Sequence, residues 1–273
     1  MLKKRLIFTL LYDSGSFMLS RNFRLQRVGD IDWLQSNYDF SRIAFFIDEL
    51  IILDVTKENK DINKFCEVLQ QLTSGCFAPI AAGGGVRSIE DARMLLNSGA
   101  DKIVINTPLF SDKTLVKDLA KKFGQQCLVG SVDILSNKNA DHRVVIECGT
   151  SVLQKPACES LNEIVNQPVG EIYLNSINQD GTGQGFDLSL LNLFIDKCPI
   201  PIIIAGGVGN AKHLAAGLSD PRVDSVATAN LFNFIGDGLK SAREQLVKDG
   251  HSLAFWPSLD DFNFKDKFSG TKN

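Results

Sequence analysis

The hydrophobic residues of this chain fall in short continuous runs that alternate with longer amphipathic segments. Runs rich in Val, Ile and Leu predict strands buried on both faces, at residues 5–11, 48–54, 78–83, 102–106, 126–133, 170–175, 201–205 and 223–228. Helical spacing of apolar positions predicts helices at about 60–73, 88–98, 112–123, 187–197, 210–218 and 236–248. Alternating strands and helices are typical of an α/β protein with a parallel sheet and right-handed crossovers.

The second half of the chain repeats the first half at an offset of 122 residues. The repeat aligns IDELIIL at 47–53 with VGEIYLN at 169–175, AAGGGVRS at 81–88 with IIAGGVGN at 203–210, and INTPLF at 105–110 with ATANLF at 227–232. A unit this long is half a domain, because solenoid repeats span only about 20–50 residues. Eight expected strands and a half-chain repeat predict a (β/α)8 TIM barrel with a twofold half-barrel repeat.

The repeat also predicts the domain organisation. We expect residues 1–250 to form a single barrel, with half-barrels at about 1–122 and 123–250, and residues 251–273 to form a C-terminal extension. The extension carries four aromatic residues that either pack on the outside of the barrel or mediate an interface, namely Phe255, Trp256, Phe262 and Phe264. Segments 12–46 and 134–168 are equivalent under the offset, and we expect both to be long loops over the barrel mouth, the end where the strands finish.

Composition excludes several classes of protein. A formal net charge of −3 argues against a nucleic-acid-binding protein. No stretch approaches the roughly 20 apolar residues that span a bilayer, so no membrane association is expected. The six cysteines show no metal-ligand spacing. We therefore expect no metal, no cofactor and free thiols in a reducing cytoplasm.

Glycines and small polar residues follow the expected strands at the mouth, where parallel barrels carry their chemistry. One cluster contains Gly84, Gly85, Asn106 and Thr107, and its repeat-related counterpart contains Asp180, Gly181, Gly206, Gly207, Ala229 and Asn230. Exposed backbone N–H groups at glycine turns and helix N-termini bind anions. Two opposed clusters predict an elongated substrate with a phosphate at each end. The alternative is that these glycines only relieve crowding in the turns.

Four charged residues stand at the starts of expected strands, on the barrel floor opposite the mouth. They are Arg5, Glu49, Lys102 and Glu171. Charges that point into a barrel are costly unless they are paired. From spacing alone, the ring is either a salt-bridge plug that closes the floor or a gate that rearranges.

These motifs resemble the cyclase subunit of imidazole glycerol phosphate synthase (HisF-like) over about residues 1–250. The resemblance is carried by MLKKRLI at the start, DELIILD at 48–54, GGGVRSIEDA at 83–92, GADKIVINT at 99–107, NQDGTGQGFD at 178–187 and PIIIAGGVG at 201–209. It implies that a glutaminase (HisH-like) subunit docks on the floor and releases ammonia. The resemblance further implies that the ammonia passes a charged gate, crosses the barrel and reacts at the mouth with a bis-phosphorylated ribonucleotide.

The resemblance also implies residue roles. It assigns the gate to the four floor charges and a partner-interface role to Asp101. It matches the phosphate-site residues of the family to Gly85, Asn106, Thr107, Asp180, Gly181, Gly206, Gly207 and Ala229.

The chain departs from that family in the chemistry. The family uses two strand-end aspartates as general acid and base, and only one of them is matched here, by Asp133. The other falls on Leu11, which cannot transfer a proton. Asp13 shares a strand face with Leu11 but is expected in the following loop. The loop lysine of the family falls on Leu19.

With these departures the chain resembles diverged paralogues of the family, and that resemblance implies delivery of ammonia for amidation of a surface-polysaccharide sugar, with a sugar amidotransferase as a further partner. The alternative is a genuine cyclase of histidine biosynthesis. A weaker third interpretation is the sister isomerase of that pathway, which needs both acids and lacks the floor gate.

Overall fold

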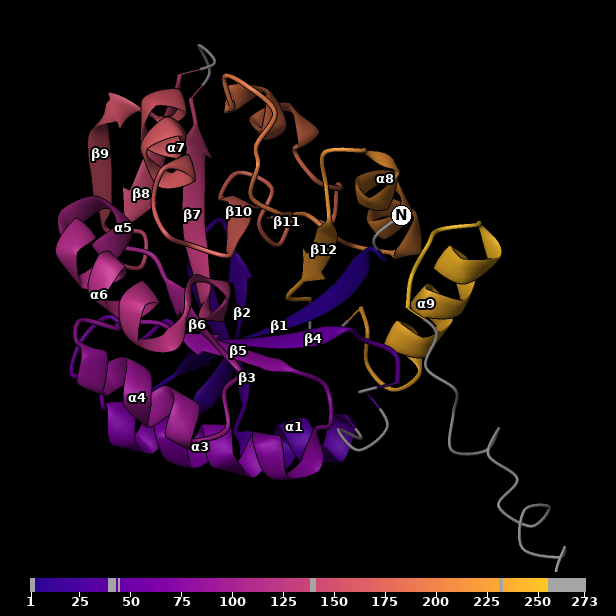
Figure 1. The fold of residues 1–273 in the computed structure, drawn as a ribbon. Coiled ribbons are helices and arrows are strands. Elements are labelled where there is room, and N and C mark those ends of the chain that lie inside the picture. Colours follow the sequence, from indigo (N-terminus) through magenta and orange to yellow (C-terminus); the bar gives the residue numbers. More distant parts are fainter. Residues whose placement is uncertain (1–2, 39–42, 44, 138–140, 231–232, 255–273) are drawn as a thin grey trace, which may run out of the picture.

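Eight parallel strands close into a barrel in the structure, a computed structural model that describes residues 3–38, 43, 45–137, 141–230 and 233–254 (Figure 1). The barrel strands are β1 (Arg5–Asp13), β4 (Glu49–Asp54), β5 (Ile80–Gly83), β6 (Lys102–Ile105), β7 (Leu128–Ser136), β10 (Glu171–Ser176), β11 (Ile202–Ala205) and β12 (Ser225–Thr228). Pairing of β1 with β12 and of β7 with β10 completes the ring. The predicted TIM barrel is therefore confirmed.

The strand register carries the twofold repeat. Leu11 of β1 lies opposite Leu53 of β4, and Asp133 of β7 lies opposite Asn175 of β10. Asp133 follows Leu11 by 122 residues in the sequence, and Asn175 follows Leu53 by the same distance. Asp133 and Leu11 therefore occupy equivalent places on opposite sides of the barrel.

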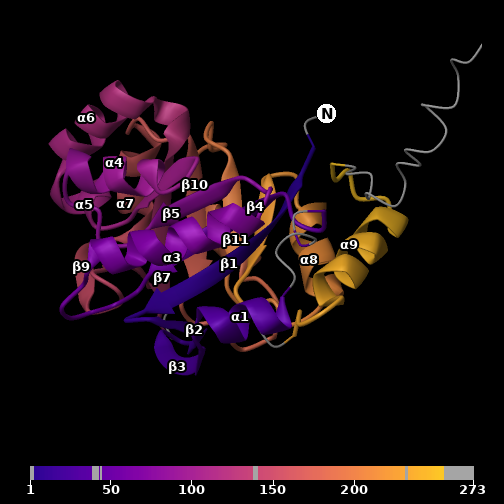
Figure 2. The ribbon, with the colours of Figure 1, turned by 90° about the horizontal axis from the view of Figure 1, so that it is seen from below.

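Helices surround the strands on the outside (Figures 1 and 2). They are α3 (Ile62–Gly75), α4 (Ile89–Asn97), α5 (Pro108–Ser111), α6 (Lys113–Phe123), α7 (Ala157–Val165), α8 (Ala211–Ser219) and α9 (Gly238–Lys248). Capping fixes where several of them begin, because Asp61, Ser88 and Asp112 each accept a hydrogen bond from a backbone N–H of the first turn.

The two long segments were wrongly predicted to be loops. The first contains β2 (Ser16–Arg21), β3 (Arg24–Gly29) and α1 (Ile31–Asn37), and the second contains β8 (His142–Ile146), β9 (Ser151–Pro156) and α7. The chain reverses after β1 at Ser14 and Gly15, both with positive φ, so that β2 pairs antiparallel with β1. A residue with positive φ at a tight turn is a hairpin signal. Each half-barrel therefore begins with a strand that continues into an antiparallel extension.

The predicted helix at 187–197 forms only a 3-10 helix over Leu188–Leu193. Pro199 and Pro201 follow closely and precede β11. Proline disfavours the helical conformation of the residue before it, so the chain extends toward the next strand. A second 3-10 helix (Gln125–Cys127) leads into β7.

The core has two layers. A large cluster fills the space between the strands and the helices, and a smaller one fills the barrel interior. The interior cluster includes Ile7, Ile51, Ala81, Val129 and Ile203. It separates the floor from the mouth.

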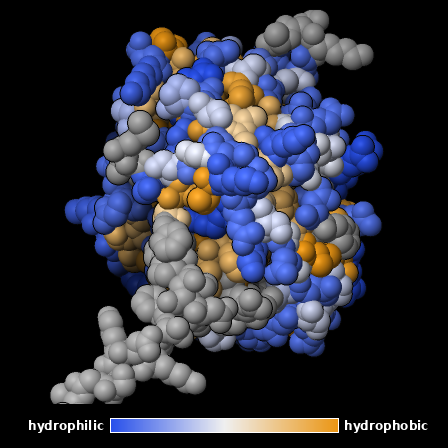
Figure 3. Space-filling view, turned by 90° about the vertical axis from the view of Figure 1, so that its right-hand side faces the viewer, coloured by the Kyte–Doolittle hydropathy of each residue, from blue (hydrophilic) through white to orange (hydrophobic). Residues whose placement is uncertain are grey.

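The chain's last described residues pack beside its first strand, since Leu253 forms a parallel bridge with Lys4. The predicted extension aromatics lie outside the described residues. The surface seen in Figure 3 is mostly hydrophilic, with hydrophobic residues in small patches. Among the described residues, no helix has the length and apolar character needed to cross a membrane. All six cysteines are free.

Candidate functional site

A cavity of about 680 Å³ opens at the mouth. All eleven residues that the sequence predicted at the mouth line it, namely Gly84, Gly85, Asn106, Thr107, Asp133, Asp180, Gly181, Gly206, Gly207, Ala229 and Asn230. They come together because each follows or ends a parallel strand, and these strand ends meet on one face of the barrel. The volume is in the usual range of small-molecule sites.

Asp133 lies in this cavity between two asparagine side chains. Asn106 Nδ2 donates to its Oδ2 at 3.1 Å, and Asn175 Nδ2 donates to its Oδ1 at 2.9 Å. Burial raises the pKa of the Asp133 carboxyl to about 6, although the Asn175 hydrogen bond favours the charged form. A carboxyl with a pKa in this range can both accept and release a proton near neutral pH. Asn175 was not singled out from the sequence.

Leu11 lines the same cavity on the opposite side of the repeat axis. Asp13, expected in a loop, is instead the last residue of β1. Its Oδ1 accepts a hydrogen bond from the exposed Ser14 hydroxyl at 2.9 Å, and Asp13 is absent from the described residues that line the cavity. The geometry therefore gives Asp13 no access to a ligand in the mouth.

Two glycine turns face the cavity from opposite halves of the barrel. Gly84 and Gly85 follow β5, with φ of +101° and +89°, and Gly206 and Gly207 follow β11, with φ of +92° and +99°. None of the four donates its backbone N–H to an acceptor among the described residues. Free N–H groups in consecutive positive-φ residues form a concavity that suits an anion. Phosphate binding there stays a prediction.

The tip of the β2–β3 hairpin is fastened to the loop after β10. Asp180 Oδ2 accepts hydrogen bonds from the Ser20 hydroxyl at 2.5 Å and from Phe23 N at 3.0 Å, and Asn22 N donates to Asp180 O at 3.0 Å. Asp180 was predicted as a phosphate-site residue, but its carboxylate is occupied by the hairpin. The hairpin places Leu19, Arg21 and Arg24 in the wall of the cavity.

A tyrosine and a threonine form the bottom of the cavity. The hydroxyls of Tyr173 and Thr9 lie 3.3 Å apart across the barrel interior. Burial raises the pKa of the Tyr173 phenol, so this group stays protonated. Tyr173 itself belongs to the apolar interior cluster.

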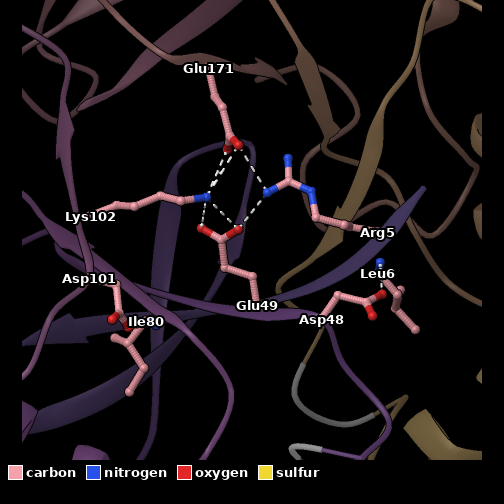
Figure 4. A network of polar contacts seen from close by, with 8 residues as sticks. All are labelled: Arg5, Leu6, Asp48, Glu49, Ile80, Asp101, Lys102 and Glu171. Atoms are coloured by element: carbon pink, nitrogen blue, oxygen red, sulfur yellow. Dashed lines mark hydrogen bonds and ion pairs between the residues drawn. The ribbon is translucent and has the colours of Figure 1, made fainter. Parts of the chain in front are cut away.

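The floor holds the four predicted charges in one network (Figure 4). Lys102 Nζ lies 2.9 Å from Glu49 Oε2 and 3.2 Å from Glu171 Oε1. Arg5 Nη1 lies 2.7 Å from Glu49 Oε2 and 3.0 Å from Glu171 Oε1. Each cation therefore bridges both carboxylates.

Glu49 is the most buried member, with 2% of its side chain exposed. Burial raises the pKa of its carboxyl, and Lys102 and Arg5 oppose that rise. Asp101 lies exposed beside the network, where its Oδ2 accepts a hydrogen bond from Ile80 N at 2.8 Å. The predicted ring thus exists as a paired network, and its action as a gate stays a prediction.

Comparison with known proteins agrees with this geometry. The model of the family described as "Histidine biosynthesis protein" matches residues 40–236. The chain is 48% identical over 265 residues to a protein of Parasynechococcus marenigrum (strain WH8102) named "Putative imidazole glycerol phosphate synthase subunit hisF2", covering 97% of this chain and 98% of that protein. With the closed barrel and its half-chain repeat, these matches show that the chain belongs to the histidine biosynthesis protein family, as a HisF-like member.

Proposed function

We propose that this HisF-like chain is the barrel subunit of an ammonia-transferring complex. It receives ammonia from a glutaminase partner at the floor and delivers it at the mouth to a phosphorylated acceptor, a sugar of a surface polysaccharide. The single observation that carries the proposal is Leu11, which stands at the place where the repeat would put a partner for Asp133.

The chemistry of the mouth suits delivery better than ring closure. Cyclisation uses a general acid and a general base, and a leucine can be neither. Ammonia that attacks an electrophilic carbon has to lose one proton, and one carboxyl can accept it. Asp133, whose pKa is about 6, is partly ionised near neutral pH and is held toward the cavity by two asparagines.

The floor network supports the ammonia route. Its two cations and two carboxylates are all paired, so a change at one member alters the contacts of the others. An apolar plug would close the floor at lower desolvation cost. A paired ring at the amino ends of the strands therefore favours a gate, and exposed Asp101 beside it suits contact with the glutaminase.

The first test is assembly and coupling. The chain should co-purify with a glutaminase encoded in the same genome. In the assembled complex, Lys102→Met should lower product formation from glutamine while sparing product formation from ammonium salts. A matched exposed variant, Lys113→Met, should change neither rate. Equal loss with both nitrogen sources in Lys102→Met would contradict a gate.

The second test separates delivery from cyclisation. The purified chain is given ammonium salts and the bis-phosphorylated ribonucleotide substrate of the cyclase family. We expect turnover at least about a hundredfold slower than in a homologue with both aspartates, because each acid–base group contributes about 10²–10⁴-fold. Full cyclase activity would refute delivery.

The alternative function is the cyclase of histidine biosynthesis itself. The pair of glycine turns favours it, because a bis-phosphorylated ribonucleotide has the two anionic ends that they suit. Complementation of a histidine auxotroph that lacks its own cyclase subunit would support this function. Failure to complement, in cells that contain the soluble chain and its glutaminase, would support delivery.

A further inference from the structure

Lys60 reaches the mouth from the loop between β4 and α3. It lines the cavity, and 23% of its side chain is exposed. Its Nζ donates to the backbone O of Asp54 at 2.7 Å and lies 3.6 Å from Asp54 Oδ1. Asp54 is buried at the end of β4, so these contacts fix the ammonium group at the edge of the cavity.

The lysine lies directly over the first glycine turn. A Cβ built on Gly85 would lie 2.5 Å from Lys60 Cδ and 3.2 Å from Lys60 Nζ. Gly85 also has a φ of +89°, so a side chain there is strained for two independent reasons. The turn thus leaves the space that the lysine occupies.

The turn and the lysine have donors left for a ligand. The backbone N–H groups of Gly84 and Gly85 reach no acceptor among the described residues. An ammonium group has three donors, and among the described residues the hydrogen bond and the ion pair of Lys60 Nζ are both with Asp54. One donor of the cation and two backbone N–H groups are therefore left for a ligand beside the same turn of the cavity.

The two glycine turns differ in whether a lysine lies beside them. Under the 122-residue offset the counterpart of Lys60 is Thr182. The Thr182 hydroxyl donates to Gln179 O at 2.8 Å. The second turn therefore receives no cation from the equivalent position.

We propose that Lys60 is the cationic ligand of a phosphate monoester bound at the Gly84–Gly85 turn. The proposal rests on the proposed function, which places a phosphorylated acceptor in the mouth. Charge-assisted hydrogen bonds to phosphate are about twice as strong as neutral ones. A phosphate at the Gly84–Gly85 turn is thus held by charge, and a phosphate at the Gly206–Gly207 turn by backbone N–H groups.

The test measures binding without turnover. Isothermal titration with ribulose 1,5-bisphosphate, as a probe with two phosphates, compares the wild type with Lys60→Gln and Lys60→Arg. We expect Lys60→Gln to weaken binding about tenfold or more, since one charged hydrogen bond is lost. Lys60→Arg keeps the charge and should bind within about threefold of wild type. The control Lys64→Gln changes an exposed lysine of α3 and should have no effect.

Crystals soaked in inorganic phosphate show which glycine turn loses its phosphate when Lys60 is replaced. We expect density at both glycine turns in the wild type, and at Gly206–Gly207 alone in Lys60→Gln. Equal affinity and equal density in Lys60→Gln would overturn the role of Lys60 and leave the proposed function standing. A wild type that binds neither probe would overturn both. If Lys60→Gln does not fold, the double variant Asp54→Asn/Lys60→Gln removes the unpaired buried charge and allows the same comparison.

Discussion

The floor network allows a quantitative prediction for Lys102→Met. This change keeps an unbranched side chain, one atom shorter, but removes one of the two cations that contact Glu49. Removing one partner of a fully buried ion pair costs about 3–5 kcal/mol. Arg5 still contacts Glu49 in the variant, and the Lys102 side chain is 20% exposed. We therefore expect a loss of roughly 2 kcal/mol, about half of the buried value.

Thermal unfolding followed by circular dichroism measures this loss. For a domain of this size, 1 kcal/mol corresponds to about 2–4 °C in melting temperature, so Lys102→Met should melt about 4–8 °C lower. The control is Lys113→Met, which breaks an ion pair of 2.7 Å whose side chains are 49% and 39% exposed. An exposed pair contributes only about 0–1 kcal/mol.

The loss should also depend on pH. Burial raises the pKa of Glu49 in the folded state. A carboxyl with a raised folded pKa stabilises the fold at low pH, and this contribution is lost as pH rises through the folded pKa. Lys102→Met removes a cation that lowers the pKa of Glu49. The loss of stability in the variant should therefore be smaller at pH 5 than at pH 8. A loss that matches the Lys113→Met control, or one that is equal at both pH values, would refute a buried network centred on Glu49.

Three further predictions concern the mouth. Because the pKa of Asp133 is raised to about 6 by burial, Asp133→Asn should stabilise the fold at pH 8 and have little effect at pH 4, as thermal melts would show; a stabilisation greater at pH 4 would contradict the sign. Gly207→Ala places a Cβ against the backbone O of Gly185 and should cost roughly 2 kcal/mol or more in urea unfolding. The matched Gly250→Ala, with similar positive φ and open space, should cost only about 1 kcal/mol; equal costs would remove the packing argument. Leu11→Asp should raise weak cyclase turnover at least about tenfold, and no gain would mean that Leu11 is not what limits cyclisation.

The repeat in the sequence indicates how the barrel strands are aligned with one another. The barrel and most of the mouth could therefore be predicted. Leu11 and Asp133 are equivalent in sequence, and they are also equivalent in strand pairing, so the leucine at the place equivalent to Asp133 is visible from the chain alone. Asn175 was missed although the same register places it beside Asp133. Asn175 lies opposite Asp133 on the neighbouring strand. Its amide can be recognised as a partner of the Asp133 carboxyl only once the strand pairing is known.

Lys60 and the hairpins were harder to predict. Lys60 lies at the expected start of a helix, where a charged residue is ordinarily solvated. Its approach to Gly85 joins segments whose contact depends on the path of the loop. The outer strands of the hairpins, β3 and β9, have no buried position, so their apolar content resembles that of a loop. The turn residues Asp13, Ser14 and Gly15 were the available signal.

The floor network carries a further consequence for how the two halves of the barrel recognise each other. Glu49 and Glu171 are repeat-related, but in the strand register the counterparts of Arg5 and Lys102 are Cys127 and Ser225. Two copies of the first half would gather four cations around two glutamates, and two copies of the second would gather two glutamates with neither cation. Only one first half with one second half brings equal and opposite charges together. The electroneutrality of the ring therefore favours the native pairing over exchange between identical halves, so the duplicated sequence specifies a closed barrel within one chain.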